Sequence, residues 1–167
     1  MSFMPETTVS YKFLDRLAAA ILQVAGLALV GMVAAESWQV FARYVLNDSP
    51  GWTEPVALLL LNVAMSLGAA AAVHSRSHFA FPIAVQACPP SLRRVLEAVR
   101  DVIVAAIGLA FALWGAQLLA DGWDVRMTGT PLPQSAVFLP MSIGGALSAL
   151  FALAALGRKA PHDEEPR

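Results

Sequence analysis

The side chains of this chain that could do chemistry are few. His74 and His78 stand four residues apart, a spacing that can hold a metal ion on one face of a helix. No acid or thiol stands at a matching position, and the Ser-Arg-Ser between them is typical of a loop, so interfacial hydrogen bonding is the better interpretation. Cys88 is the only cysteine, which excludes a disulfide framework and a multi-cysteine metal site. We expect no metal and no cofactor.

The sequence also lacks the residue combinations that usually make up a catalytic site. His162 lies in a polar tail, and the serines have no partner that would activate them as nucleophiles. A haem bound in a helix bundle would need histidines inside the apolar segments, and none lies there. The sequence therefore predicts no catalytic residue and no enzyme.

The densest cluster of polar and aromatic residues is 38–54, WQVFARYVLNDSPGWTE. Wound as a helix, its first part is amphipathic, because polar side chains recur there at steps of three or four residues. These polar residues are Glu36, Gln39, Arg43 and Asn47. Ser-Pro-Gly ends this segment, and a new helix begins with Thr53 as a plausible N-cap and Glu54 in its first turn. We expect Arg43, Asn47 and Glu54 to form a structural polar set, and a direct Arg43–Glu54 ion pair is a hypothesis.

The composition places these residues in an all-α integral membrane protein. The 167 residues are 57% hydrophobic and 14% charged, with a mean hydropathy of +0.62, and the apolar residues lie in long runs. Runs of this length predict four transmembrane helices, at about 14–36, 54–73, 98–120 and 136–156. Residues 1–13 and 157–167 are polar tails. The net charge of -1 gives no basic field that would attract nucleic acid.

The connections between these spans add two expectations. The amphipathic residues after the first span predict an interfacial segment there. Phe79–Cys88 is apolar but too short to cross a membrane, so we predict a second interfacial segment after the second span. In the last span, Pro140 followed by Gly144 and Gly145 predicts a bend or a close contact between helices.

The basic residues predict the topology. With four spans, nine of the eleven Lys and Arg residues fall on the side of the two termini, and only Arg43 and Arg126 fall on the other. The positive-inside rule then places both termini in the cytoplasm. Trp38, Trp52 and Trp123 fall on the opposite side, where an indole suits the headgroup layer.

The lipid-depth parts of the four spans carry no Asp, Glu, Lys, Arg or His. A carrier or pump usually keeps an ionisable residue at that depth to bind its ion or charged substrate. The chain is therefore a poor transporter by itself. A self-contained small channel or exporter that oligomerises stays open as an alternative.

Together these features resemble the small membrane subunit of TRAP transporters, the DctQ-like family of tripartite ATP-independent periplasmic systems. The matching residues are Phe41-x-Arg43-Tyr44-Val45-Leu46-Asn47, Trp52-x-Glu54, Gly68, His78, the Pro-Leu-Pro loop and Pro140-x-x-x-Gly144-Gly145. The resemblance covers about residues 14–156. The family often has an acid shortly after the histidine and a second acid after the one matching Glu54, and this chain departs from it at both places.

The resemblance implies a scaffold subunit in the bacterial inner membrane that supports sodium-driven uptake of an organic acid, such as a C4-dicarboxylate. Its partners would be a large multi-span membrane subunit, which carries the sodium and substrate sites, a periplasmic substrate-binding protein, and membrane lipid. The residues expected to act in structure or partner contact are Trp38, Arg43, Asn47, Trp52, Glu54, His78, Pro140, Gly144 and Gly145.

Overall fold

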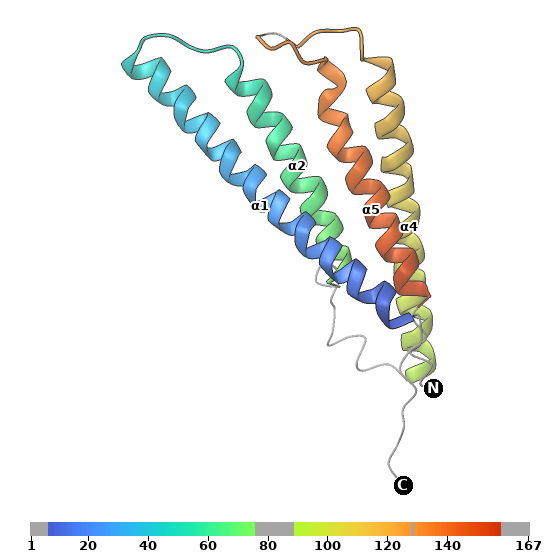
Figure 1. The fold of residues 1–167 in the computed structure, drawn as a ribbon. Coiled ribbons are helices and arrows are strands. Elements are labelled where there is room, and N and C mark those ends of the chain that lie inside the picture. The colour runs from blue at the N-terminus through green and yellow to red at the C-terminus, as the bar shows by residue number, and fades with distance from the viewer. Residues whose placement is uncertain (1–6, 76–88, 128, 158–167) are drawn as a thin grey trace.

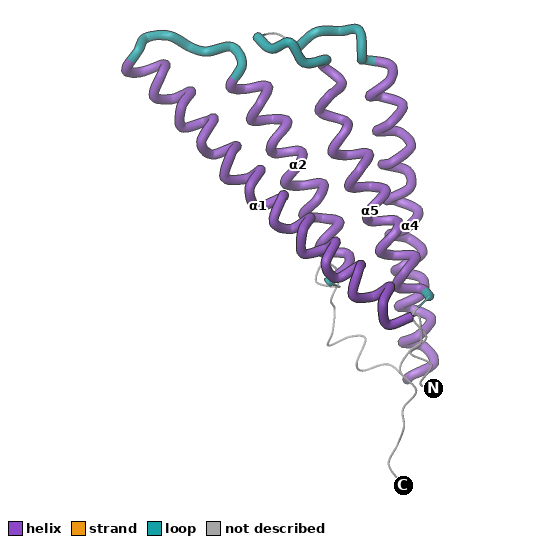
Figure 2. Tube along the Cα trace, viewed as in Figure 1, coloured by secondary structure: helices purple, strands orange, loops and turns teal. Residues whose placement is uncertain are grey.

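The computed structural model describes residues 7–75, 89–127 and 129–157, which are helical apart from their connections (Figures 1 and 2). The elements are α1 (Thr7–Val45), α2 (Thr53–His74), α4 (Pro90–Asp121), the 3-10 helix η1 (Gln134–Val137) and α5 (Phe138–Leu156). The four α-helices are each long and apolar enough to cross a membrane. The predicted all-helical protein with four apolar helices is confirmed.

The predicted amphipathic segment after the first span is not a separate helix. α1 runs without a break for 39 residues, so residues 38–45 are its last turns. A helix of this length is about 58 Å long, nearly twice the roughly 30 Å of a bilayer's hydrocarbon core. No proline or glycine stands between Met32 and Val45 to end it earlier. The segment predicted at Phe79–Cys88, and His78, lie outside the described residues.

The helices form a single curved row rather than a square bundle. α1 packs on α2, α2 on α5, and α5 on α4. Figure 1 shows the row spread like a fan. At its narrow end, α1 begins and α2 and α5 end; at its wide end lie the connections 46–52 and 122–133. The two outer helices of the row, α1 and α4, are each covered mainly by one neighbour, so much of their apolar surface stays uncovered.

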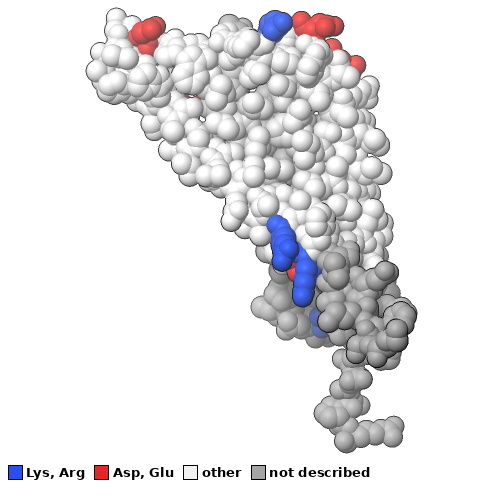
Figure 3. All heavy atoms as spheres, viewed as in Figure 1, with Lys and Arg blue, Asp and Glu red and all other residues white. Residues whose placement is uncertain are grey.

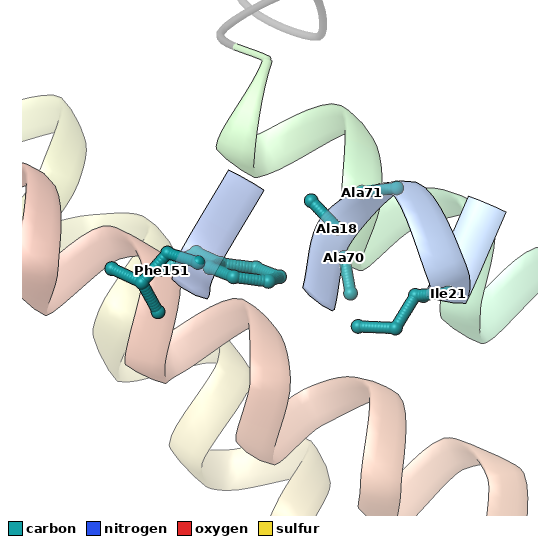
Figure 4. Packing of buried hydrophobic residues seen from close by; sticks show 6 residues of the cluster. Ala18, Ile21, Ala70, Ala71 and Phe151 are labelled. Atoms are coloured by element: carbon teal, nitrogen blue, oxygen red, sulfur yellow. The ribbon is translucent and has the colours of Figure 1, made fainter. Parts of the chain in front are cut away.

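Small side chains let α1 and α2 approach closely along the row. The buried face of α1 is a stripe at steps of three, four or seven residues, made of Leu14, Ala18, Ile21, Ala25, Ala28, Ala35 and Ala42. Alanine at such positions brings two backbones near each other, which favours packing in lipid. At the narrow end this stripe meets Ala70 and Ala71 of α2 and Phe151 of α5 in one apolar cluster (Figure 4).

The surface of the row matches a membrane environment. On the face shown in Figure 3, charged atoms lie at the two ends and the surface between them carries none. Large apolar side chains face outward at that level, including Leu27, Val30 and Trp114. Exposed apolar surface of this extent is stable only against lipid or a partner protein.

Candidate functional site

The end of α1 is built by Asn47. Its φ of 52° lies in the left-handed region, which asparagine tolerates better than most residues. This turn lets the N–H groups of Leu46 and Asp48 both donate to the Ala42 carbonyl oxygen, each at 3.1 Å. Asn47 therefore acts through its backbone conformation, by reversing the chain at the wide end.

The start of α2 differs in detail from the prediction. Trp52, not Thr53, is the N-cap residue, and no side chain caps this helix end. Thr53 is the first helical residue; it is fully buried, and its hydroxyl donates to the Pro50 carbonyl oxygen at 2.9 Å. The threonine thus ties the helix to the turn before it. Glu54 follows in the first turn and is exposed, where the helix dipole favours an acid.

The hypothesised Arg43–Glu54 ion pair is not formed. Among the described residues the ion pairs are His74–Asp15, Arg93–Glu97 and Arg100–Asp101. The side chains of Arg43 and Glu54 are both exposed at the wide end. Within this chain the expected polar set is therefore not a hydrogen-bonded cluster: Asn47 shapes a turn, while the two charged residues face outward.

The two connections at the wide end touch each other. Gly129 adopts a φ of 80°, and a Cβ there would lie within 3.1 Å of the Gly51 Cα, so only a glycine fits this approach. The 122–133 connection is braced internally, because the Arg126 guanidinium donates to the Pro131 carbonyl oxygen at 2.6 Å. A bridge between Arg126 and Pro133 closes the same loop. The wide end is thus one continuous surface made by both connections.

A polar contact joins α2 to the start of α5. The Asn62 amide donates to the Val137 carbonyl oxygen at 2.7 Å, and the Ser66 hydroxyl donates to the Asn62 side-chain oxygen at 3.0 Å. Val137 is the N-cap residue of α5, so this hydrogen bond ties α2 to the first turn of that helix. The sequence alone did not identify these partners.

Gly144 and Gly145 serve two different neighbours of α5. A Cβ on Gly144 would lie 2.6 Å from the Ser66 carbonyl oxygen of α2, and a Cβ on Gly145 would lie 2.7 Å from the Gly108 carbonyl oxygen of α4. Both glycines are buried, as is Pro140. The predicted close contact is present. Each glycine makes one contact, Gly144 with α2 and Gly145 with α4, so α5 fits closely between these two helices.

A groove of about 630 Å³ opens between α2 and α4, with α5 as its floor. Its lining is mainly apolar: Met65 lies in the wall made by α2, Phe111 in the wall made by α4, and Met141, Gly144 and Gly145 in the floor. No charged residue lines it, so it offers no means to hold an ion by charge. Among the described residues no group of three or more His, Cys, Asp or Glu side chains could hold a metal ion.

His74 makes a junction at the narrow end that the sequence did not reveal. Its Nε2 lies 2.8 Å from Oδ1 of Asp15 on α1, and its ring packs on Phe151 of α5 with centroids 4.8 Å apart. One histidine thus contacts the two helices that flank α2. Asp15 and His74 are far apart in sequence, so spacing alone gave no signal for this pair.

These features define a class of protein: a multi-pass membrane subunit, built as one row of helices with polar residues at its ends and tight helix contacts between them. The described residues bring together no set that would catalyse a reaction or hold a cofactor.

The chain belongs to the DctQ family, the DctQ component of tripartite ATP-independent periplasmic transporters, whose family model matches residues 32–162. That match covers well over half of the chain and includes the wide-end turn, α2, α4 and α5. The protein is thus a transport component and not an enzyme. No curated protein matches the chain.

Proposed function

We propose that this chain is the scaffold subunit of a TRAP-type secondary transporter, supporting sodium-driven uptake of an organic acid such as a C4-dicarboxylate. It resides in the bacterial inner membrane as a four-span domain over about residues 14–156, with short tails at 1–13 and 157–167. Both termini face the cytoplasm, so the wide end faces the periplasm. The distribution of Lys and Arg supports this orientation.

The observation that carries the proposal, together with the family, is the open row of helices. α1 and α4 each pack mainly on one helix, so a large apolar area is left for lipid and partners. The groove between α2 and α4 carries no charge, which favours a subunit that supports transport over one that binds the ion or substrate.

The partners are the other two components of a three-part system: a large multi-span membrane subunit and a periplasmic substrate-binding protein. At the wide end, Trp38, Trp52, Arg43 and Glu54 are exposed and are proposed as contacts for them. Asn47, Pro140, Gly144 and Gly145 act inside the chain by holding the helices that present this surface. His78, beyond the described residues, is kept as a proposed contact from the resemblance alone.

Reconstituted uptake tests the proposal. Proteoliposomes would contain the large subunit with or without this chain, and uptake of labelled C4-dicarboxylate would be measured with the binding protein and an inward sodium gradient. We expect uptake only when both membrane subunits are present. Full-rate uptake by the large subunit alone would overturn the scaffold role, and solute flux through this chain alone would favour the small channel or exporter.

The polar residues at the wide end can be tested in the same system. Because Arg43 and Glu54 do not pair within the chain, we expect Arg43→Ala and Glu54→Ala each to weaken co-purification with the large subunit, with additive losses. A strongly non-additive double variant would show that the two residues act on one another in the complex.

A further inference from the structure

The narrow end of α1 carries two basic side chains with a defined direction. Lys12 and Arg16 each stand two residues from Leu14, which is buried in the apolar cluster with Ala70 and Ala71 of α2 and Phe151 of α5. At about 100° per residue, both point roughly 160° away from Leu14. They therefore lie together on the face of α1 opposite to this cluster, and both are exposed.

The acid nearest to these two cations in sequence, Asp15, is bonded to a residue of another helix. Asp15 stands between the two cations along the chain, but its carboxylate is bonded to His74 on α2 at 2.8 Å. Of the other described basic residues near this end, Arg93 and Arg100 are paired with acids of their own helix, whereas Arg94 of α4 is exposed and forms no ion pair with a described acid. Among the described residues, Lys12 and Arg16 have no acid within ion-pair distance.

The surface next to these cations is apolar. Farther along the same face of α1, Leu27 is 72% exposed and Val30 is 68% exposed. Leu27 lies eleven residues beyond Arg16, about 16 Å along the helix, close to the roughly 15 Å that one leaflet contributes to the hydrocarbon core. Figure 3 shows basic atoms at the narrow end, with acidic atoms beside them and uncharged surface above.

We propose that Lys12 and Arg16 bind the phosphate of an anionic phospholipid, whose acyl chains lie along the exposed apolar face of α1. Two cations at the edge of an apolar surface match a lipid, which joins a negative headgroup to apolar chains. A free phosphate would use the cations but not the surface beyond them. The site anchors the first turns of α1 on the face that no other described helix covers, and it does not depend on the transport role proposed above.

Lipid binding to the full chain tests this site. The purified chain in neutral detergent would be titrated with phosphatidylglycerol or phosphatidylcholine, and bound lipid counted by native mass spectrometry. We expect phosphatidylglycerol to bind more tightly, and Lys12→Gln and Arg16→Gln each to weaken its binding about fivefold, the effect of one basic residue at an anionic membrane surface. Lys12→Arg, which keeps the charge, should bind as the wild type does.

Arg93→Gln is the matched control, because it makes the same change in net charge but removes a cation already paired with Glu97. Equal affinity for the two lipids, or an equal loss in Arg93→Gln, would overturn the site. Displacement of phosphatidylglycerol by millimolar inorganic phosphate would overturn the lipid assignment and leave a general phosphate site. Far-UV circular dichroism of each variant checks that the helices are intact.

Discussion

Replacing Gly144 by valine tests whether the contact between α2 and α5 holds the row together. A Cβ at this position would lie 2.6 to 2.8 Å from the carbonyl oxygen, carbonyl carbon and Cβ of Ser66. Two of these are backbone atoms, so the conflict is relieved only by moving a helix. Overpacking of this kind typically costs about 1–3 kcal/mol. We expect Gly144→Val to lower the free energy of unfolding by about 2 kcal/mol or more.

Gly26→Val on α1 is the control for this measurement. A Cβ at Gly26 meets nothing within 4 Å, so the substitution leaves only the change in helix propensity, a gain of a few tenths of a kcal/mol. The same gain applies at Gly144, so the difference between the two variants isolates the steric cost. Unfolding by sodium dodecyl sulfate in mixed micelles, followed by circular dichroism, gives both values. Equal stability of the two variants would refute the claim that Gly144 permits the close approach.

Three further substitutions test single contacts by the same unfolding assay. Asn62→Leu removes an interhelical hydrogen bond of 2.7 Å and should cost about 0.6–1.7 kcal/mol; an unchanged stability would mean that this bond contributes nothing net. Asn47→Ala should cost about 1 kcal/mol because its φ is 52°, whereas Asn47→Gly should be near neutral, and equal effects would exclude a conformational cause. His74→Leu should destabilise the chain, while Asp15→Asn, which keeps a hydrogen-bonding group opposite the histidine at 2.8 Å, should do so less; the reverse order would contradict the junction.

The membrane architecture was predictable because it follows from composition and run length. Four apolar runs of about twenty residues have few alternatives in water or lipid. The glycine pair at 144 and 145 was predictable as a close contact, since adjacent glycines inside an apolar helix have few other structural uses. What the sequence did not indicate is that the two glycines face different neighbours, α2 and α4.

The differences at the wide end have a local cause. The amphipathic pattern predicted an interfacial segment after the first span, and because nothing in residues 36–45 breaks the backbone, this segment is the continuation of α1 to Val45. Thr53 is of a residue type that often caps helices, but it stands one position after the N-cap residue Trp52. Its hydroxyl donates instead to the Pro50 carbonyl oxygen in the preceding turn. The residue types indicated that this turn is structurally important, but the contacts of each side chain depend on the backbone conformation, which the sequence did not reveal.

The contacts within the row are distributed in a way that suits a stationary support. At the narrow end, His74 and the apolar cluster hold α1, α2 and α5 together. In the middle, α5 lies in close backbone contact with α2 at Gly144 and with α4 at Gly145. At the wide end, the two connections meet at Gly51 and Gly129. Because the α1–α2 and α4–α5 hairpins are joined at three levels, a movement of one against the other would break several contacts at once.

Spin labels placed at Tyr44 and Trp123 test this expectation. We expect one narrow distance distribution between them with and without sodium and substrate. Two resolved distances would mean that the row itself moves during transport.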